Sequence, residues 1–180
     1  INSAKVKNLA NDFRTIPTYI YAYQDKFRAI PGDQPQAVLD TQFPPANTAT
    51  ASSTVANLGN GVINGVWNAT AATDESFVFW QHVRLANLAA GPTNTADANY
   101  IPRNSLGGII GITSGAVIAT MTGTYSVCSA GILGKFAKQL DIQMDDGNTT
   151  TGSMRSTSDG ATAAAAPLAD DQSFTVCTTF

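Results

Sequence analysis

The stretch VKNLANDFRTIPTYIYAYQDKFRAIPGD, residues Val6–Asp33, decides the fold class because a strong helical pattern runs through it. Its apolar residues recur every three or four positions, at Val6, Leu9, Phe13, Ile16, Ile20, Tyr23 and Phe27. Pro17 lies inside the pattern and predicts a bend, because proline removes one intrahelical hydrogen-bond donor. Pro31 and Gly32 predict the end of the helix. We therefore expect one long, kinked helix over residues 1–30.

Length and composition limit what the rest of the chain can be. The chain has 180 residues, which suits a single domain over residues 1–180 with a real core. Its net charge is −3, so no basic patch for nucleic acid is indicated. Charged residues make up 13%, against roughly 25% in typical soluble domains. A surface of small neutral side chains is typical of secreted or self-associating proteins, although compositional drift is an equal alternative.

The segments after the first helix change character twice. Residues 34–66 are rich in proline, glycine and small polar side chains, and they predict a long irregular loop. A second helix is predicted from Thr73 or Asp74, which can cap it, to Leu88. Four of its side chains lie along one side, namely Phe77, Trp80, Arg84 and Leu88.

The second half of the chain predicts an antiparallel sheet. Strands are expected within residues 106–128, with a hairpin turn around Thr122-Gly123, and again at Ser173–Thr178. Between them we expect a short helix at 133–140, a brief strand at 141–144, a turn at 145–148 and a loop at 149–171. With the long first helix, this order predicts an α+β fold.

The two cysteines, Cys128 and Cys177, leave two options, either buried free thiols or one disulfide. The disulfide is favoured because it would hold a Thr/Ser-rich tail that would otherwise fray. On the loop-entropy argument it would contribute about 4 kcal/mol to stability. A disulfide in turn implies an oxidising compartment.

Few residues suggest catalysis or metal binding. His82 is the only histidine, and a lone histidine on an aromatic helix is more often structural than catalytic, so we expect no enzyme and no cofactor. Asp141, Asp145 and Asp146 precede Gly147 and could hold Ca²⁺, with Asp170 and Asp171 as possible further ligands. The favoured interpretation is turn chemistry, in which Asp side chains accept hydrogen bonds from nearby amides.

Three motifs, in this order, resemble the type IV pilin-like (prepilin-type) family of pilins, minor pilins and secretion-system pseudopilins. The first is Tyr23, Lys26-Phe27 and Pro31-Gly32-Asp33 at the end of the long helix. The second is FWQHVRLANL, residues 79–88, which contains Trp80. The third runs from LDI at 140–142 through DDG at 145–147 to TGSMR at 151–155. The late cysteine pair is also similar to the disulfide that closes many pilins.

This resemblance implies a ladle-shaped α+β domain in which a long N-terminal helix packs on an antiparallel sheet. Residues 1–30 would be the C-terminal half of the long helix and 31–72 the αβ-loop. Residues 73–180 would form the second helix, the sheet and a disulfide-closed C-terminal region. The family's cleavage glycine and apolar start are absent, so we expect that a leading segment is missing before Ile1.

The function that the resemblance implies is structural. The chain would be a major or minor pilin that assembles with other subunits through the missing apolar helix. It would lie in the inner membrane before cleavage and methylation, and in a cell-surface pilus afterwards. The alternatives are a pseudopilin, which could bind calcium, and a secreted adhesive module that binds a surface or host ligand through residues 34–66 and 156–166.

Overall fold

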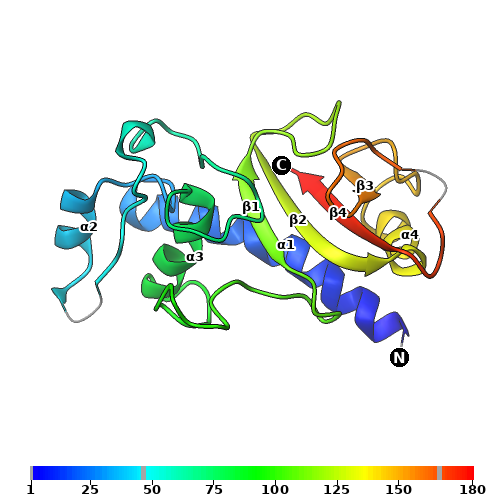
Figure 1. Ribbon diagram of the computed structural model, residues 1–180, viewed down its shortest axis with the longest axis horizontal. Helices are drawn as coiled ribbons and strands as arrows, with labels where there is room; N and C mark the ends of the chain where they lie inside the picture. Colours follow the sequence, from blue (N-terminus) through cyan, green and yellow to red (C-terminus); the bar gives the residue numbers. More distant parts are fainter. Residues whose placement is uncertain (1, 46–47, 166–167) are drawn as a thin grey trace. The chain divides into compact units, whose positions relative to one another are not determined.

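The computed structural model describes residues 2–45, 48–165 and 168–180, and Figure 1 shows its elements. The chain forms two compact units. The sheet unit contains Ile1–Ile16 and Arg103–Phe180, and the helical unit contains Pro17–Pro102. The expected leading segment before Ile1, and Asn47 and Ala166 in the expected loops, lie outside the described residues. The single domain expected from the length stays a prediction.

The first helix, α1, spans Asn2–Phe27 and runs through Pro17 without a break. Its predicted stripe is buried at Val6, Leu9, Phe13, Ile16, Ile20 and Tyr23, while Phe27 is half-buried. The predicted end near Pro31 is wrong. Arg28 already adopts a left-handed conformation with φ 56°, which a continuing helix does not allow. The helix therefore ends at Phe27, and Pro31 lies in the turn that follows it.

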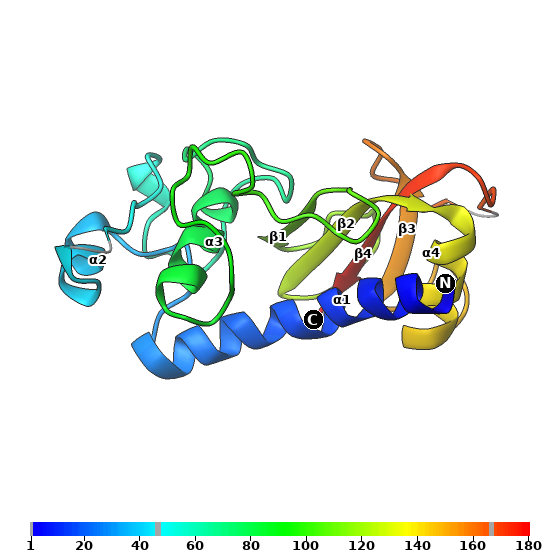
Figure 2. The ribbon, with the colours of Figure 1, turned by 90° about the horizontal axis from the view of Figure 1, so that it is seen from below.

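The sheet unit is built on four strands, β1 (Ile110–Ser114), β2 (Tyr125–Leu133), β3 (Met154–Ser158) and β4 (Ser173–Thr179). Their order is β1-β2-β4-β3, and every neighbouring pair is antiparallel. The part of α1 before Pro17 runs along one face of this sheet (Figures 1 and 2). Helix α4 (Gly134–Met144) follows β2 directly and contacts β2, β3 and β4. The predicted α+β class is therefore confirmed.

Two predictions in the sheet unit are wrong. Residues 141–144 are the last turn of α4 and not a strand, because Phe136, Ala137, Leu140 and Asp141 form one buried helical face. The predicted loop at 149–171 contains β3, whose side chains alternate only weakly between apolar and polar. Pairing with β4 makes this segment a strand, which a local pattern does not reveal.

The helical unit contains α2 (Gln36–Gln42), a short 3₁₀ helix η2 (Val55–Asn57) and α3 (Glu75–Leu85). The prediction of an irregular loop over 34–66 therefore missed α2, which is only seven residues long. Asp74, one of the two predicted capping residues, occupies the N-cap position of α3, but its side chain makes no capping hydrogen bond. The helix ends at Leu85 and not at Leu88. Residues 75–84 are all buried, so α3 is enclosed by the segments around it and not amphipathic.

Hydrogen bonds from side chains hold the long segment between α1 and α3 in place. Gln36 donates from Nε2 to the Ala49 carbonyl at 2.8 Å and accepts from the Ala51 amide at 2.9 Å. The Ser52 and Thr54 hydroxyls both donate to the Thr73 carbonyl, at 2.8 and 2.7 Å.

Within the described part of the chain, no helix combines the length and hydropathy needed to cross a bilayer.

Candidate functional site

The turn at Pro31-Gly32-Asp33 contacts α3 at close range. Gly32 has φ 90°, and a Cβ atom there would lie 2.6 Å from the Glu75 carbonyl oxygen. The Gly32 amide donates to Nδ1 of His82 at 3.0 Å. Only glycine meets both the conformation and the close approach. The turn predicted as a helix stop is therefore a docking point for the start of α3.

Asp33 holds a second segment against the same turn. Its carboxylate is 6% exposed. It accepts hydrogen bonds from the amides of Gly59 at 3.0 Å, Asn60 at 3.2 Å and Gly61 at 2.8 Å. With three backbone amides donating to one side chain, Asp33 fixes the loop at 59–61.

Glu75 supplies a second buried carboxyl group next to Asp33. It is 1% exposed. Oε1 accepts from the Asn64 amide at 2.9 Å, whereas the buried Oε2 has no hydrogen-bond donor. Burial, and to a smaller extent the charge of Asp33, raises the pKa of Glu75 to about 8. At neutral pH Glu75 is therefore protonated, and its proton can be shared with Asp33.

His82 completes this junction cluster, which we define as Gly32, Asp33, Glu75 and His82. Its side chain is fully buried, with Nε2 2.9 Å from the Thr50 carbonyl. Because Nδ1 accepts from Gly32, the Nε2 proton must donate to Thr50, and the ring is neutral. Burial lowers the pKa of His82 to about 4. Both ring nitrogens are occupied, so His82 connects three segments and is not placed to act as a base.

Trp80, the other residue singled out on α3, belongs to an aromatic layer around Arg84. Its ring packs edge-on against Phe79 with centroids 5.0 Å apart. The Arg84 guanidinium lies 5.9 Å from the Trp80 ring and 5.1 Å from the Tyr100 ring. Arg84 also donates to the carbonyls of Pro92 at 2.9 Å and Tyr100 at 2.6 Å. Trp80 and Arg84 thus have a packing role. Through Arg84, the segment from Pro92 to Tyr100 is held against α3.

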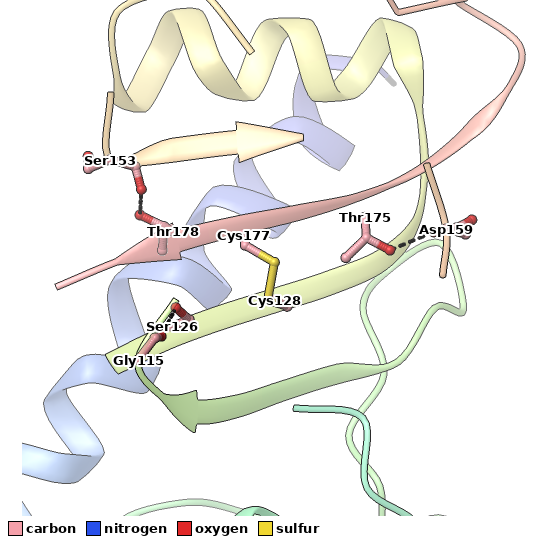
Figure 3. The surroundings of a disulfide bond; sticks show 8 residues. All are labelled: Gly115, Ser126, Cys128, Ser153, Asp159, Thr175, Cys177 and Thr178. Atoms are coloured by element: carbon pink, nitrogen blue, oxygen red, sulfur yellow. Dashed lines mark hydrogen bonds between the residues drawn. A yellow bond between two sulfur atoms is a disulfide. The ribbon is translucent and has the colours of Figure 1, made fainter. Parts of the chain in front are cut away.

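The disulfide between Cys128 and Cys177 is present and fully buried. Figure 3 shows it joining β2 to β4, where the two residues are direct register partners with Cα atoms 4.1 Å apart. Beside it, Thr178 donates to the Ser153 carbonyl at 3.1 Å and Thr175 donates to Asp159 at 2.7 Å. The bridge therefore fixes the last strand of the chain into the middle of the sheet, and the free-thiol alternative is wrong.

The acidic cluster, Asp141, Asp145 and Asp146, lies in the sheet unit at the end of α4. One carboxylate oxygen from each residue lies within 4.8 Å of the others. Asp145 accepts from the Met154 amide at 3.0 Å, and Asp146 accepts from the Asn148 amide at 2.9 Å and from the Thr151 hydroxyl. These two residues make the turn hydrogen bonds that the sequence predicts, and Gly147 occupies the turn with φ 80°.

Asp141 differs from the other two members of the acidic cluster. It is 0% exposed, and its carboxylate oxygens make no hydrogen bond of normal geometry, although the Gly147 amide and the Asp146 side chain interact with them. Burial, followed by the neighbouring Asp146 and Asp145, raises the pKa of Asp141 to about 7, and the Gly147 amide acts in the opposite direction. Asp170, which was expected as a further ligand, instead pairs with Lys138 at 2.7 Å.

The structure thus separates the residues selected from sequence into three places. The junction cluster unites Gly32 and Asp33 with Glu75 and His82. The disulfide and the acidic cluster belong to the other unit.

Comparisons of the chain with protein-family models, curated proteins and solved structures gave no match.

Proposed function

We propose that this chain is the globular part of a structural subunit in a type IV pilus-like filament, a major or minor pilin with no catalytic role. The observation that carries the proposal is the combination of a long helix, an antiparallel sheet and a disulfide in the sheet unit. The first half of a long helix runs along an antiparallel four-stranded sheet, and a late disulfide ties the final strand to the sheet centre. The pilin-like resemblance of the three motifs implies the same arrangement.

The two faces of α1 support this proposal in different ways. The apolar face is used within the chain, since residues from Val6 to Tyr23 on it are buried. The other face is mostly polar and exposed, with Lys7, Asn11 and Arg14 among its side chains. Such a helix can hold a sheet, but it offers little apolar surface for a filament core. We therefore propose that assembly uses an apolar helix that leads into α1.

The partners and location follow from this assembly. The neighbours of each subunit are other pilin subunits, identical or related. The precursor is anchored in the inner membrane through the apolar helix, and the assembled filament lies at the cell surface. A buried disulfide between adjacent strands fits this route, because disulfides persist in oxidising compartments.

The test is to delete the gene in the organism that carries it and to analyse filaments sheared from the cells. We expect the sheared fraction of the parent strain to contain peptides of this chain, and the mutant to lose filaments or produce fewer of them. The complete gene should restore them, whereas a gene without the codons upstream of Ile1 should not. Unchanged filaments that contain no peptide of this chain would contradict the proposal.

A further inference from the structure

The loop that the junction cluster holds contains two Asn-Gly pairs, Asn60-Gly61 and Asn64-Gly65. Asparagine before glycine is prone to intramolecular deamidation, because glycine has no side chain to hinder attack by its own amide nitrogen. Asn60 and Gly61 are exposed, and a Cβ atom at Gly61 would meet nothing within 4 Å. We propose that Asn60 is a self-modification site, which converts to aspartate or isoaspartate when the loop opens and which Asp33 keeps unreactive while the loop is closed.

The reaction needs only atoms of the chain and one water molecule. The Gly61 amide nitrogen forms a bond to Asn60 Cγ, and the bond from Cγ to Nδ2 breaks. Ammonia leaves with the proton of the Gly61 amide, and a cyclic succinimide remains. Water then opens the ring without any change of oxidation state. Opening at Cγ gives aspartate, whereas opening at the Asn60 carbonyl carbon gives isoaspartate, whose main chain runs through Cγ and is one methylene longer.

In the fold, the polar groups that take part in this reaction are hydrogen-bonded to other partners. The attacking group, the Gly61 amide, donates to Asp33 Oδ2 at 2.8 Å. The side-chain oxygen of Asn60 accepts from the Val62 amide at 3.1 Å, and its Nδ2 donates to Asn64 Oδ1 at 2.8 Å. Asp33 also accepts from the two amides that precede Gly61. The loop must therefore release Asp33 before the Gly61 nitrogen can turn toward Asn60 Cγ.

Asn64 provides an internal comparison, because its backbone is held independently of Asp33. Its amide donates to Glu75 Oε1 at 2.9 Å, and its carbonyl accepts from the Ser76 amide at 3.1 Å. Both contacts fix it to the first turn of α3. Loss of the Asp33 contacts should therefore free Asn60 and leave Asn64 in place.

Closing the loop again does not reverse the modification. Deamidation adds a negative charge at residue 60, whose amide donates to Asp33, and like charges repel. Isoaspartate also lengthens the chain between the Gly59 and Gly61 amides, which both donate to the same carboxylate. Either product weakens the contact with Asp33, so each opening that leads to reaction makes the next one easier.

The experiment compares deamidation rates at two sites within one peptide. Native and urea-unfolded wild-type protein are incubated at pH 7, and samples are digested with chymotrypsin, which can release residues 59–67 by cleavage after Leu58 and Trp67. Fragmentation in the mass spectrometer assigns the product to Asn60 or Asn64, and isoaspartyl methyltransferase detects isoaspartate. Three hydrogen bonds of ordinary net strength leave the loop open in about one molecule in 100, so Asn60 should react about 100-fold more slowly in the native protein.

The variants make the test specific. Asp33→Asn, which loses the charge and one acceptor oxygen, should speed the reaction at Asn60 about tenfold and leave Asn64 unchanged. Asp25→Asn, which removes an exposed acid of the same unit, should react like the wild type. Unchanged rates in a folded Asp33→Asn protein, or equal acceleration at both asparagines, would overturn the proposal.

The wild-type comparison decides the question even if Asp33→Asn does not fold. Rates at Asn60 that agree within about twofold between native and unfolded protein would show that the closed loop gives no protection, and absence of reaction in the unfolded chain would show that the site is inert. Either result would overturn the proposal. None of these results depends on filament assembly, so the modification site and the proposed function fail separately.

Discussion

Replacing Glu75 by glutamine should leave the protein unchanged below pH 4.5 and stabilise it increasingly as the pH rises from there to 8. In the fold, burial raises the pKa of Glu75 from 4.5 to about 8. A raised pKa means that the folded state favours the protonated form. The stabilising contribution is complete below pH 4.5 and is lost as the pH rises toward and through 8. Glutamine keeps an acceptor for Asn64 and a donor for Asp33 but does not ionise.

The magnitude follows from the interval between the two pKa values. Each pH unit in that interval changes the free energy of unfolding by about 1.4 kcal/mol, so the full difference approaches about 5 kcal/mol above pH 8. We expect Glu75→Gln to gain about 4 kcal/mol at pH 8, which raises Tm by about 8–16 °C.

The assay is urea unfolding of the wild type and of Glu75→Gln from pH 5 to 8.5, with Asp25→Asn as a control for the loss of an exposed charge. His82 also affects the profile, because its lowered pKa destabilises the fold as the pH falls below 6.5. Both proteins contain His82, so the difference between them isolates Glu75. If the two profiles are parallel, or if Glu75→Gln is the less stable protein at pH 8, then Glu75 is ionised in the fold and the reasoning is wrong.

Three further predictions concern the disulfide, the turn after α1 and the buried histidine. Replacing both Cys128 and Cys177 by alanine should lower the unfolding free energy by about 4 kcal/mol and Tm by about 10 °C, and an unchanged Tm would show that the bridge contributes nothing. Gly32→Ala should cost about 2–4 kcal/mol in urea unfolding, because the new Cβ atom meets the Glu75 carbonyl at 2.6 Å. Gly59→Ala, which has φ 77° but no atom within 4 Å of the new Cβ, should cost only about 1–2 kcal/mol, and equal losses would remove the steric argument. His82→Gln should weaken the loss of stability between pH 6.5 and about 4, which thermal melts can follow, and an unaltered acid profile would contradict a buried neutral imidazole.

The sequence predicts well those parts of the fold in which apolar residues follow a clear local periodicity. The stripe from Val6 to Tyr23 repeats at helical spacing, and the same residues are buried on α1. The last strand likewise alternates around Phe174 and Val176, and it forms β4. In both segments the local pattern and the final environment agree, so no distant contact is needed to predict them.

The parts that sequence misses are decided by contacts between distant segments. The segment Met154–Ser158 becomes β3 because β4 offers it a pairing edge. Glu75 lies in the first turn of α3, but its partner Asp33 comes from the other side of a long loop. The grouping of Asp141 with Asp145 and Asp146 was visible, but the burial of Asp141 was not. Asp141 is fully buried, whereas Asp145 and Asp146 are not.

The most direct test of the central claim is immunogold electron microscopy of intact cells with antibodies raised against residues 1–180. Our account predicts gold particles along the length of surface filaments for a major pilin, or at sparse, reproducible positions on them for a minor pilin. A strain without the gene should show no labelling. Labelling confined to free protein in the medium, with unlabelled filaments on the same cells, would contradict the account.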